Sequence, residues 1–265
     1  MERGVGSNQW SVGQWLVFSR SDEYSLLVIR NSSLKMSERQ RLHQVYAARA
    51  ERLAGRDVDS LGNPAHLFAI QSRQRAIVRR LRREELWPLT GRDVLEVGCG
   101  SGGVLLELAS YGAEAGRLHG TDLLAERAAI ARQRVPQAAV TCANGGLLPY
   151  PTATFDLLLQ FTVFSSILDK ALCYTVASEM RRVLKPGGLI LWYDFWLNPL
   201  NRHTRGIRPK EIREYFPDSQ YSFERITLAP PLTSRLVPLS WTGALALEGL
   251  GIFNTHYLAA IRPNR

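Results

Sequence analysis

The residues best suited to chemistry lie between Asp93 and Gly103, where a short apolar run ends in an acid and leads directly into glycines. Glu96 comes just before three glycines, at positions 98, 100 and 102. Glycine adopts backbone angles that other residues avoid and lets the main chain approach a ligand closely. A strand, a glycine turn and a helix in this order can hold a nucleoside-sized cofactor at the carboxyl end of a first parallel strand.

The glycine spacing alone does not distinguish two classes of cofactor. Gly98, Gly100 and Gly103 satisfy the dinucleotide fingerprint G-x-G-x-x-G, whereas Gly98, Gly100 and Gly102 satisfy G-x-G-x-G. Asp122 follows the next predicted strand and is suited to accept hydrogen bonds from the ribose hydroxyls of either class. The pattern therefore predicts a nucleoside cofactor, with a glycine turn that binds nothing as the alternative.

Three further features favour one class. They are the acid Glu96, the stretch from Asn144 to Leu159 with its Leu-Pro and Phe-Asp pairs, and the stretch Arg182 to Ile190, which reads RVLKPGGLI. In this order and spacing they resemble the class I S-adenosylmethionine-dependent methyltransferases, and most closely the small-molecule subgroup that includes quinone-biosynthesis enzymes. The resemblance covers residues 90–195 well and residues 37–90 loosely.

The resemblance implies a cofactor site and S-adenosyl-L-methionine as the cofactor. Glu96 would orient the turn or meet the methionine amino group, Asp122 would bind the ribose, and Leu123 would lie against adenine. Asn144 stands where the family usually has Asp, and its amide oxygen can still accept from the adenine amine. The full set of implied cofactor residues is Glu96, Gly98, Cys99, Gly100, Gly102, Asp122, Leu123, Asn144, Gly145, Gln160 and Phe161.

The methyl-acceptor site is expected beyond the fifth strand. Asp194 and His203 are the candidate catalytic residues, because a hydroxyl acceptor needs a base and histidine titrates near neutral pH. A structural carboxylate and a surface-loop histidine are the alternatives. The candidate acceptor-binding residues are Tyr46, as a lid, with Tyr193, Asn198 and Arg208. The C-terminal part is similar to methyltransferases of bacterial sugar and polysaccharide biosynthesis, in which His203, Arg205 and Arg208 would hold an anionic group.

The elements that must position these residues alternate between strand and helix, which predicts an α/β fold with a parallel sheet covered on both faces. Strands are expected at 92–97, 117–121, 138–142, 154–160, 187–194, 221–228 and 252–261, and helices at 37–53, 64–87, 102–111, 124–134, 169–184 and 208–215 and in part of 232–250. Residues 185–188 are expected to form a turn. The family implies a Rossmann-like, seven-stranded, mostly parallel sheet in the order 3-2-1-4-5-7-6.

The predicted organisation is one methyltransferase domain, residues 36–265, with a helical cap at 36–90, a cofactor-binding core at 91–195 and an acceptor side at 196–265. Residues 1–35 differ from the rest and are expected to be a disordered or wrongly included extension, with translation starting at Met36. Ser37 then serves as the N-cap of the first helix, with Gln40 three residues on.

Composition and charge limit the other functions. The 265-residue chain has three cysteines without metal-ligand spacing and no run long enough to span a bilayer, which favours the cytoplasm. Its net charge is +9, and arginines gather at 73, 75, 79, 80, 82 and 83. A solvated helix face is the simplest interpretation, and an anionic substrate, peripheral contact with an anionic membrane or nucleic acid are the alternatives.

The expected reaction is O-methylation of a sugar, glycan or secondary metabolite, with a small-molecule acceptor as partner. Carbon methylation of the quinone type, a nucleic-acid methyltransferase and a non-catalytic cofactor-binding protein remain alternatives, and a nicotinamide oxidoreductase is disfavoured by the later motifs. Nucleic acid is not expected as a partner, because the stretch from Gln160 to Val163 lacks the Asn/Asp-Pro-Pro-Tyr/Phe motif. No metal site and no particular oligomeric state are predicted.

Overall fold

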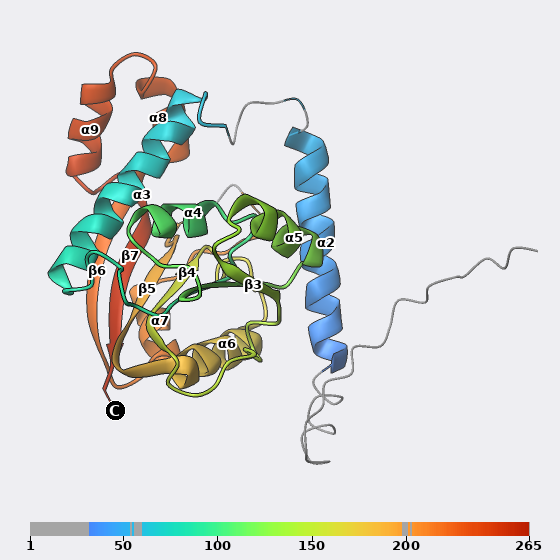
Figure 1. Ribbon diagram of the computed structural model, residues 1–265. Helices are drawn as coiled ribbons and strands as arrows, with labels where there is room; N and C mark the ends of the chain where they lie inside the picture. The colour runs from blue at the N-terminus through green and yellow to red at the C-terminus, as the bar shows by residue number, and fades with distance from the viewer. Residues whose placement is uncertain (1–31, 54, 56–59, 198–200, 202, 265) are drawn as a thin grey trace, which may run out of the picture. The chain divides into compact units, whose positions relative to one another are not determined.

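The computed structural model describes residues 32–53, 55, 60–197, 201 and 203–264. The chain divides into two units, Met1–Ser37 and Glu38–Arg265, and the second contains the fold (Figure 1). The first described helix, α2 (Ser32–Leu53), begins five residues before the predicted N-cap Ser37. Most of the predicted extension, and the acceptor candidate Asn198, lie outside the described residues.

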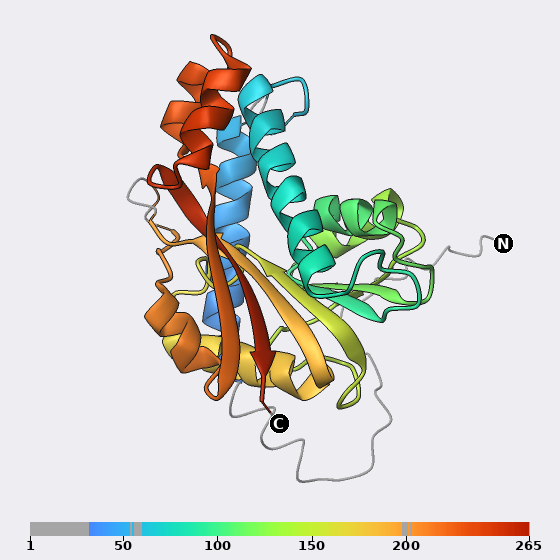
Figure 2. The ribbon, with the colours of Figure 1, turned by 90° about the vertical axis from the view of Figure 1, so that its left-hand side faces the viewer.

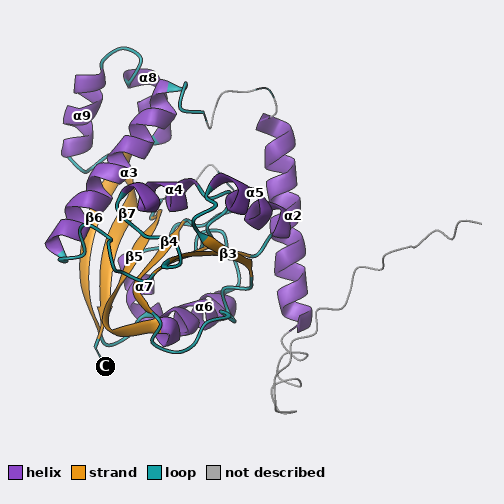
Figure 3. Cartoon of the chain, in the orientation of Figure 1, coloured by secondary structure: helices purple, strands orange, loops and turns teal. Residues whose placement is uncertain are grey.

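A seven-stranded sheet forms the centre of the second unit (Figure 3). Its strand order is β3-β2-β1-β4-β5-β7-β6, which confirms the predicted order. All neighbours up to β5 are parallel, and β7 is antiparallel to both β5 and β6. The strands are β1 (Val94–Val97), β2 (Leu118–Asp122), β3 (Ala139–Cys142), β4 (Phe155–Phe161), β5 (Leu184–Phe195), β6 (Ser219–Leu228) and β7 (Asn254–Pro263).

Helices cover both faces of the sheet, as the alternating sequence predicts (Figure 2). They are α3 (Pro64–Arg83), α4 (Gly103–Ser110), α5 (Ala125–Arg134), α6 (Lys170–Val183) and α7 (Pro209–Tyr215). The helices α8 (Pro230–Leu236) and α9 (Trp241–Gly249) pack beside α3 at one end of the sheet (Figure 1 and Figure 2). Asn63 starts α3, because its Oδ1 accepts from the Ala65 amide at 3.0 Å and Pro64 suits the first turn. No described helix combines the length and apolarity that crossing a bilayer requires.

The alternation of side chains along the strands builds two cores. Leu157, Leu159 and Leu191 belong to a cluster with buried residues of α3, α4 and α5. Leu158 and Trp192 belong to a second cluster with buried residues of α6 and α7. Successive residues of a strand point to opposite faces, so this parity decides which cluster each strand residue joins.

Strand β5 departs from the prediction at its start. Residues 185–188 were expected to form a turn before the strand, but they lie within β5. The pairing passes from Phe155 with Leu184 to Leu157 with Leu189, so the β5 backbone makes an irregular excursion against β4. Gly187, at φ +76°, permits this excursion. The glycines therefore interrupt the ladder instead of preceding it.

Candidate functional site

A pocket of about 550 Å³ opens beside the turn that follows β1. Such a position, at the carboxyl ends of parallel strands, is where α/β sheets bind ligands. Ten sequence-predicted residues line it, and they are Tyr46, Glu96, Gly98, Cys99, Gly100, Asp122, Leu123, Asn144, Gly145 and Phe161. The structure therefore brings nearly all of the predicted cofactor residues together.

Backbone contacts hold the glycine turn open toward this pocket. The amides of Gly98 and Cys99 donate to the Thr121 carbonyl at 2.7 and 2.8 Å, which ties the turn to the end of β2. The Asp122 carboxylate accepts from the Gly100 amide at 2.8 Å and from the Leu124 amide at 2.9 Å. A carboxylate has about four acceptor sites, so Asp122 can shape the turn and still accept from hydroxyl groups.

Glu96 is the most unusual group in the pocket wall. Its side chain is 2% exposed, and its Oε2 has no hydrogen-bond partner among the described residues. Burial raises its pKa to about 8, and the nearby charges of Glu107 and Asp122 add to that rise against the opposing effect of Arg73. A buried acceptor without a donor is an expensive arrangement that a bound cation or amine would relieve.

Sequence reasoning did not assign Arg73 and Glu107 to this pocket. Arg73 Nη2 and Glu107 Oε1 form an ion pair at 2.5 Å, and the Arg73 guanidinium lies 5.8 Å from the Phe161 ring centre. A sequence signal for Arg73 exists, because it shares the inward face of α3 with Ile70 and Ile77 at helical spacing. Its partner lies 34 positions away in the chain, which no local pattern indicates.

Most of the arginines that give α3 its positive charge form ion pairs. Four of the six arginines singled out in the sequence meet acidic side chains of the same unit. The pairs are Arg73 with Glu107, Arg75 with Glu248, Arg79 with Glu224, and Arg80 with Glu84 and Glu224. Much of this helix face is therefore neutralised within the fold, and contact with an anionic membrane stays a prediction.

Polar and aromatic side chains add to the lining of the pocket, among them Asn144, Tyr46 and Arg127. Asn144 Oδ1 accepts from the Gly146 amide at 2.9 Å, so the side chain shapes its own turn while lining the pocket. The Arg127 guanidinium lies 4.2 Å from the centre of the Tyr46 ring. Since Tyr46 belongs to α2 and Arg127 to α5, this cation–π contact joins two elements across the pocket rim.

Two predicted cofactor residues do not line the pocket. Gly102 is the N-cap of α4 at φ +81°, and a side chain there would press on Ala131 of α5. Gln160 is fully buried, and its Oε1 accepts from the Val163 amide at 3.1 Å. Both residues support the pocket from behind, because they fix the turns that carry the lining residues.

The two candidate catalytic residues, Asp194 and His203, lie in different surroundings. Asp194 is 1% exposed and lines neither the pocket beside β1 nor the second, smaller cavity that contains His203. Its carboxylate accepts from the Ser165 and Phe195 amides at 3.0 and 2.9 Å. Burial raises its pKa to about 7. This placement favours a positioning role for Asp194 over the catalytic role expected from sequence. His203 is exposed and lines a second cavity of about 270 Å³.

The remaining acceptor candidates also differ in place. Tyr46 lines both cavities. Tyr193 is buried, and its hydroxyl pairs with Thr227 at 3.0 Å, because its position in β5 turns it toward the α3 face. Arg208 is the N-cap of α7 and lines neither cavity, and Arg205 bonds Tyr215 at 2.8 Å. No three His, Cys, Asp or Glu side chains in the described part of the chain gather as a metal site.

Comparison with known proteins agrees with this arrangement. Residues 94–188 match the methyltransferase domain family. A probable S-adenosylmethionine-dependent methyltransferase of Mycolicibacterium smegmatis is 33% identical over 150 residues, which are 51% of this chain and 53% of that protein. The demethylmenaquinone methyltransferase of Bacillus licheniformis is 33% identical over 104 residues, 38% of this chain and 44% of that protein. The chain thus spans about half the length of such relatives, or less.

Solved structures with the same fold include proteins of different activity. The [4+2]-cyclase SpnF has a TM-score of 0.53 at 18% identity, covering 72% of this chain and 82% of that one. A phosphoethanolamine N-methyltransferase of Haemonchus contortus, in complex with S-adenosyl-L-methionine, has a TM-score of 0.53 at 18% identity, covering 78% of this chain and 59% of that one. These likenesses concern the fold. The matching domain and its relatives identify residues 94–188 as a methyltransferase domain, and over about half of its length the chain is similar to S-adenosylmethionine-dependent methyltransferases.

Proposed function

We propose that this chain binds S-adenosylmethionine in the pocket beside β1 and transfers its methyl group to a small molecule. The observation that carries the proposal is Glu96, a buried carboxyl group whose Oε2 lacks a donor. The ammonium group of the methionine part of the cofactor would supply that donor and favour the ionised carboxylate.

The other lining residues fit the remaining parts of the cofactor. The turn from Gly98 to Gly100 exposes main chain to the pocket, and Asp122 has spare acceptor sites for the ribose hydroxyls. Asn144 and Leu123 also line the pocket, and we assign the recognition of the adenine ring to them. The volume of about 550 Å³ falls within the usual range for a small-molecule site.

When bound, S-adenosylmethionine supplies a methyl carbon activated by its positive sulfur. An acceptor atom with a free electron pair would take this methyl group and leave the cofactor as S-adenosylhomocysteine, and a hydroxyl acceptor would lose its proton to a base or to water. The protein contributes mainly alignment of the two reactants. His203 is the base that we propose, because it lines the second cavity, whereas Asp194 holds the Ser165 turn.

For the acceptor, we propose a sugar, glycan or secondary metabolite methylated at oxygen, in the cytoplasm. The free thiols of Cys99, Cys142 and Cys173 are consistent with that compartment. Methylation at carbon is the second candidate, and the similarity to the demethylmenaquinone methyltransferase favours it. The cyclase with the same fold shows that the fold alone does not fix the reaction.

The test is turnover. Purified protein is incubated with S-adenosylmethionine and a panel of hydroxylated sugars, phenols and quinols, and S-adenosylhomocysteine and methylated products are quantified by mass spectrometry. We expect product with at least one acceptor and a lower rate for Glu96→Gln at limiting cofactor. Cofactor binding without any methylated product across the panel would support a non-catalytic binding protein instead.

A further inference from the structure

The second cavity adjoins the cofactor pocket. Its volume is about 270 Å³, and Leu42, Tyr46, Thr162 and Ser166 line both cavities. A molecule in the second cavity would therefore meet a molecule in the first at these four side chains. Typical pockets for drug-sized ligands span about 300–1,000 Å³, so this cavity suits a single ring or a short chain.

The lining of the second cavity is basic and rich in hydroxyl groups. Arg49 and Arg52 come from one face of α2, three residues apart, and His203 comes from the segment after β5. The described residues of the lining are Leu42, Val45, Tyr46, Ala48, Arg49, Arg52, Thr162, Ser165, Ser166, Phe195, Asn201, His203 and Thr204. No Asp or Glu is among these described residues, and their positive charge favours an anion.

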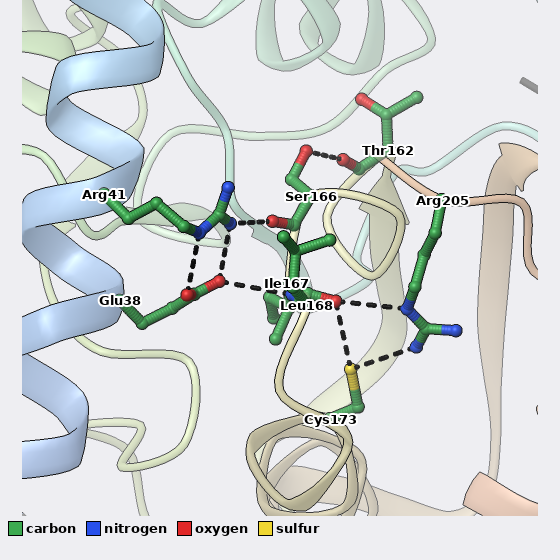
Figure 4. A network of polar contacts seen from close by, with 8 residues as sticks. All are labelled: Glu38, Arg41, Thr162, Ser166, Ile167, Leu168, Cys173 and Arg205. Atoms are coloured by element: carbon green, nitrogen blue, oxygen red, sulfur yellow. Dashed lines mark hydrogen bonds and ion pairs between the residues drawn. The ribbon is translucent and has the colours of Figure 1, made fainter. Parts of the chain in front are cut away.

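The segment after β4 that borders both cavities is held by several polar contacts (Figure 4). Arg41 of α2 forms an ion pair with Glu38 at 2.6 Å and donates to the Ser166 carbonyl, and Glu38 accepts from the Leu168 amide at 3.2 Å. On the opposite side, Arg205 donates to the Ile167 carbonyl at 3.3 Å. The segment after β4 is thus held from two directions, with α2 against it.

Two further hydrogen bonds fix the residues that border the second cavity. The Ser166 hydroxyl donates to the Thr162 carbonyl at 2.9 Å, and the His203 amide donates to Asn201 Oδ1 at 3.0 Å. A preorganised site loses less free energy to ordering when it binds a small ligand.

From this geometry we propose that the second cavity binds the methyl acceptor and that the acceptor carries an oxyanion, a carboxylate or a phosphate. Arg49 and Arg52 hold the oxyanion, and the accepting atom points toward Thr162 and Ser166, where the cavities meet. This inference rests on the proposed function, and it narrows the acceptor to a small anionic molecule.

The test measures binding of three matched probes to the full chain, in the presence of S-adenosylhomocysteine. The probes are benzoate, phenyl phosphate and the neutral benzamide, and their binding is measured by ligand-observed NMR. We expect at least one anion to bind about tenfold or more tightly than benzamide, because charged hydrogen bonds are the stronger ones. The comparison of benzoate with phenyl phosphate identifies which oxyanion the site prefers.

Variants assign the binding to this cavity. Arg52→Gln and Arg49→Gln should each weaken the preferred anion about tenfold, whereas Arg39→Gln, an exposed arginine of the same helix outside both linings, should not. The affinity for S-adenosylhomocysteine should stay within twofold in all three variants, which also reports that α2 remains folded.

Equal binding of benzamide and both anions would overturn the inference, and so would anion binding that both cavity variants leave unchanged. The proposed function has its own readout in the same samples. If the wild-type chain does not bind S-adenosylhomocysteine, the proposed function fails, whereas cofactor binding without anion preference rejects only the acceptor assignment.

Discussion

The glycine turn makes a quantitative prediction at Gly98. Its φ of +75° belongs to the left-handed region, and a β-carbon there would overlap Cγ2 of Val163, which lies two residues beyond the end of β4. Gly116 has a similar φ of +81°, but a β-carbon there would meet nothing within 4 Å. Alanine at position 116 is therefore destabilised only by its left-handed backbone conformation. Alanine at position 98 is destabilised by that conformation and also by the steric overlap with Val163.

The magnitudes follow from these two terms. The left-handed conformation costs alanine about 1–2 kcal/mol, and overpacking costs about 1–3 kcal/mol. The gain from restricting the unfolded chain is the same for both substitutions, so it cancels in their difference. We expect Gly98→Ala to lower the free energy of unfolding by about 1–3 kcal/mol more than Gly116→Ala does.

Urea denaturation of the two variants, with Val163→Ala alone and combined with Gly98→Ala, measures this difference. Val163→Ala removes the overlapping methyl group, so the double variant should be more stable than the sum of the single effects by about 1–3 kcal/mol. Equal losses at Gly98 and Gly116, or strict additivity with Val163→Ala, would refute the steric reasoning.

Three further predictions concern charged groups. Glu107→Ala leaves the half-buried Arg73 without this partner and should cost about 1–3 kcal/mol in urea denaturation, most of which Arg73→Met combined with Glu107→Leu should recover. The pKa of Glu96 is raised from 4.5 to about 8, so the folded protein keeps a proton that the unfolded chain releases. Stability should therefore fall as pH rises from about 4.5 to 8, by up to about 1.4 kcal/mol per pH unit for one proton, and less steeply in Glu96→Gln. Arg41→Ala breaks the contacts to Glu38 and the segment after β4, so amides of α2 should exchange hydrogen faster than in the wild type.

Each of these has a contradicting outcome. The ion-pair account fails if the double replacement at 73 and 107 is as unstable as Glu107→Ala alone. The linkage account is rejected if the wild type and Glu96→Gln have the same pH dependence of unfolding. Unchanged exchange in α2 after Arg41→Ala, relative to alanine at the exposed neighbour Arg39, would show that other contacts hold this helix.

Local chemistry explains what the sequence predicted well. The turn after Glu96 and the acid Asp122 are short patterns with direct physical meaning, and the structure gathers them around one pocket. The strand order was predictable only through the family resemblance, because pairing between distant strands leaves no local trace. The stretch 185–188 combines Pro and Gly in a way typical of turns, yet it lies within β5, where it forms an irregularity without partners in β4.

The acceptor side was less predictable because it depends on side-chain direction and on long-range partners. Tyr193 and Asp194 end a strand, as expected, but neither lines a cavity. The Tyr193 hydroxyl pairs with Thr227, and the Asp194 carboxylate holds two amides. The alternation of side chains along β5 places Tyr193 on the same face as Leu191, which is the face that α3 covers. The pairing of Arg73 with Glu107, by contrast, follows from tertiary packing alone.

Calorimetric titration with S-adenosylhomocysteine at pH 7, run beside NADH and repeated with Glu96→Gln, tests the central claim most directly. The account predicts micromolar binding of S-adenosylhomocysteine, little binding of NADH, and about tenfold or greater weakening in the variant, since a charged hydrogen bond contributes about 1.5–3 kcal/mol. Binding should also release protons, because the ligand ammonium lowers the raised pKa of Glu96. Tighter binding of NADH, or an affinity for S-adenosylhomocysteine that Glu96→Gln leaves unchanged, would contradict the account.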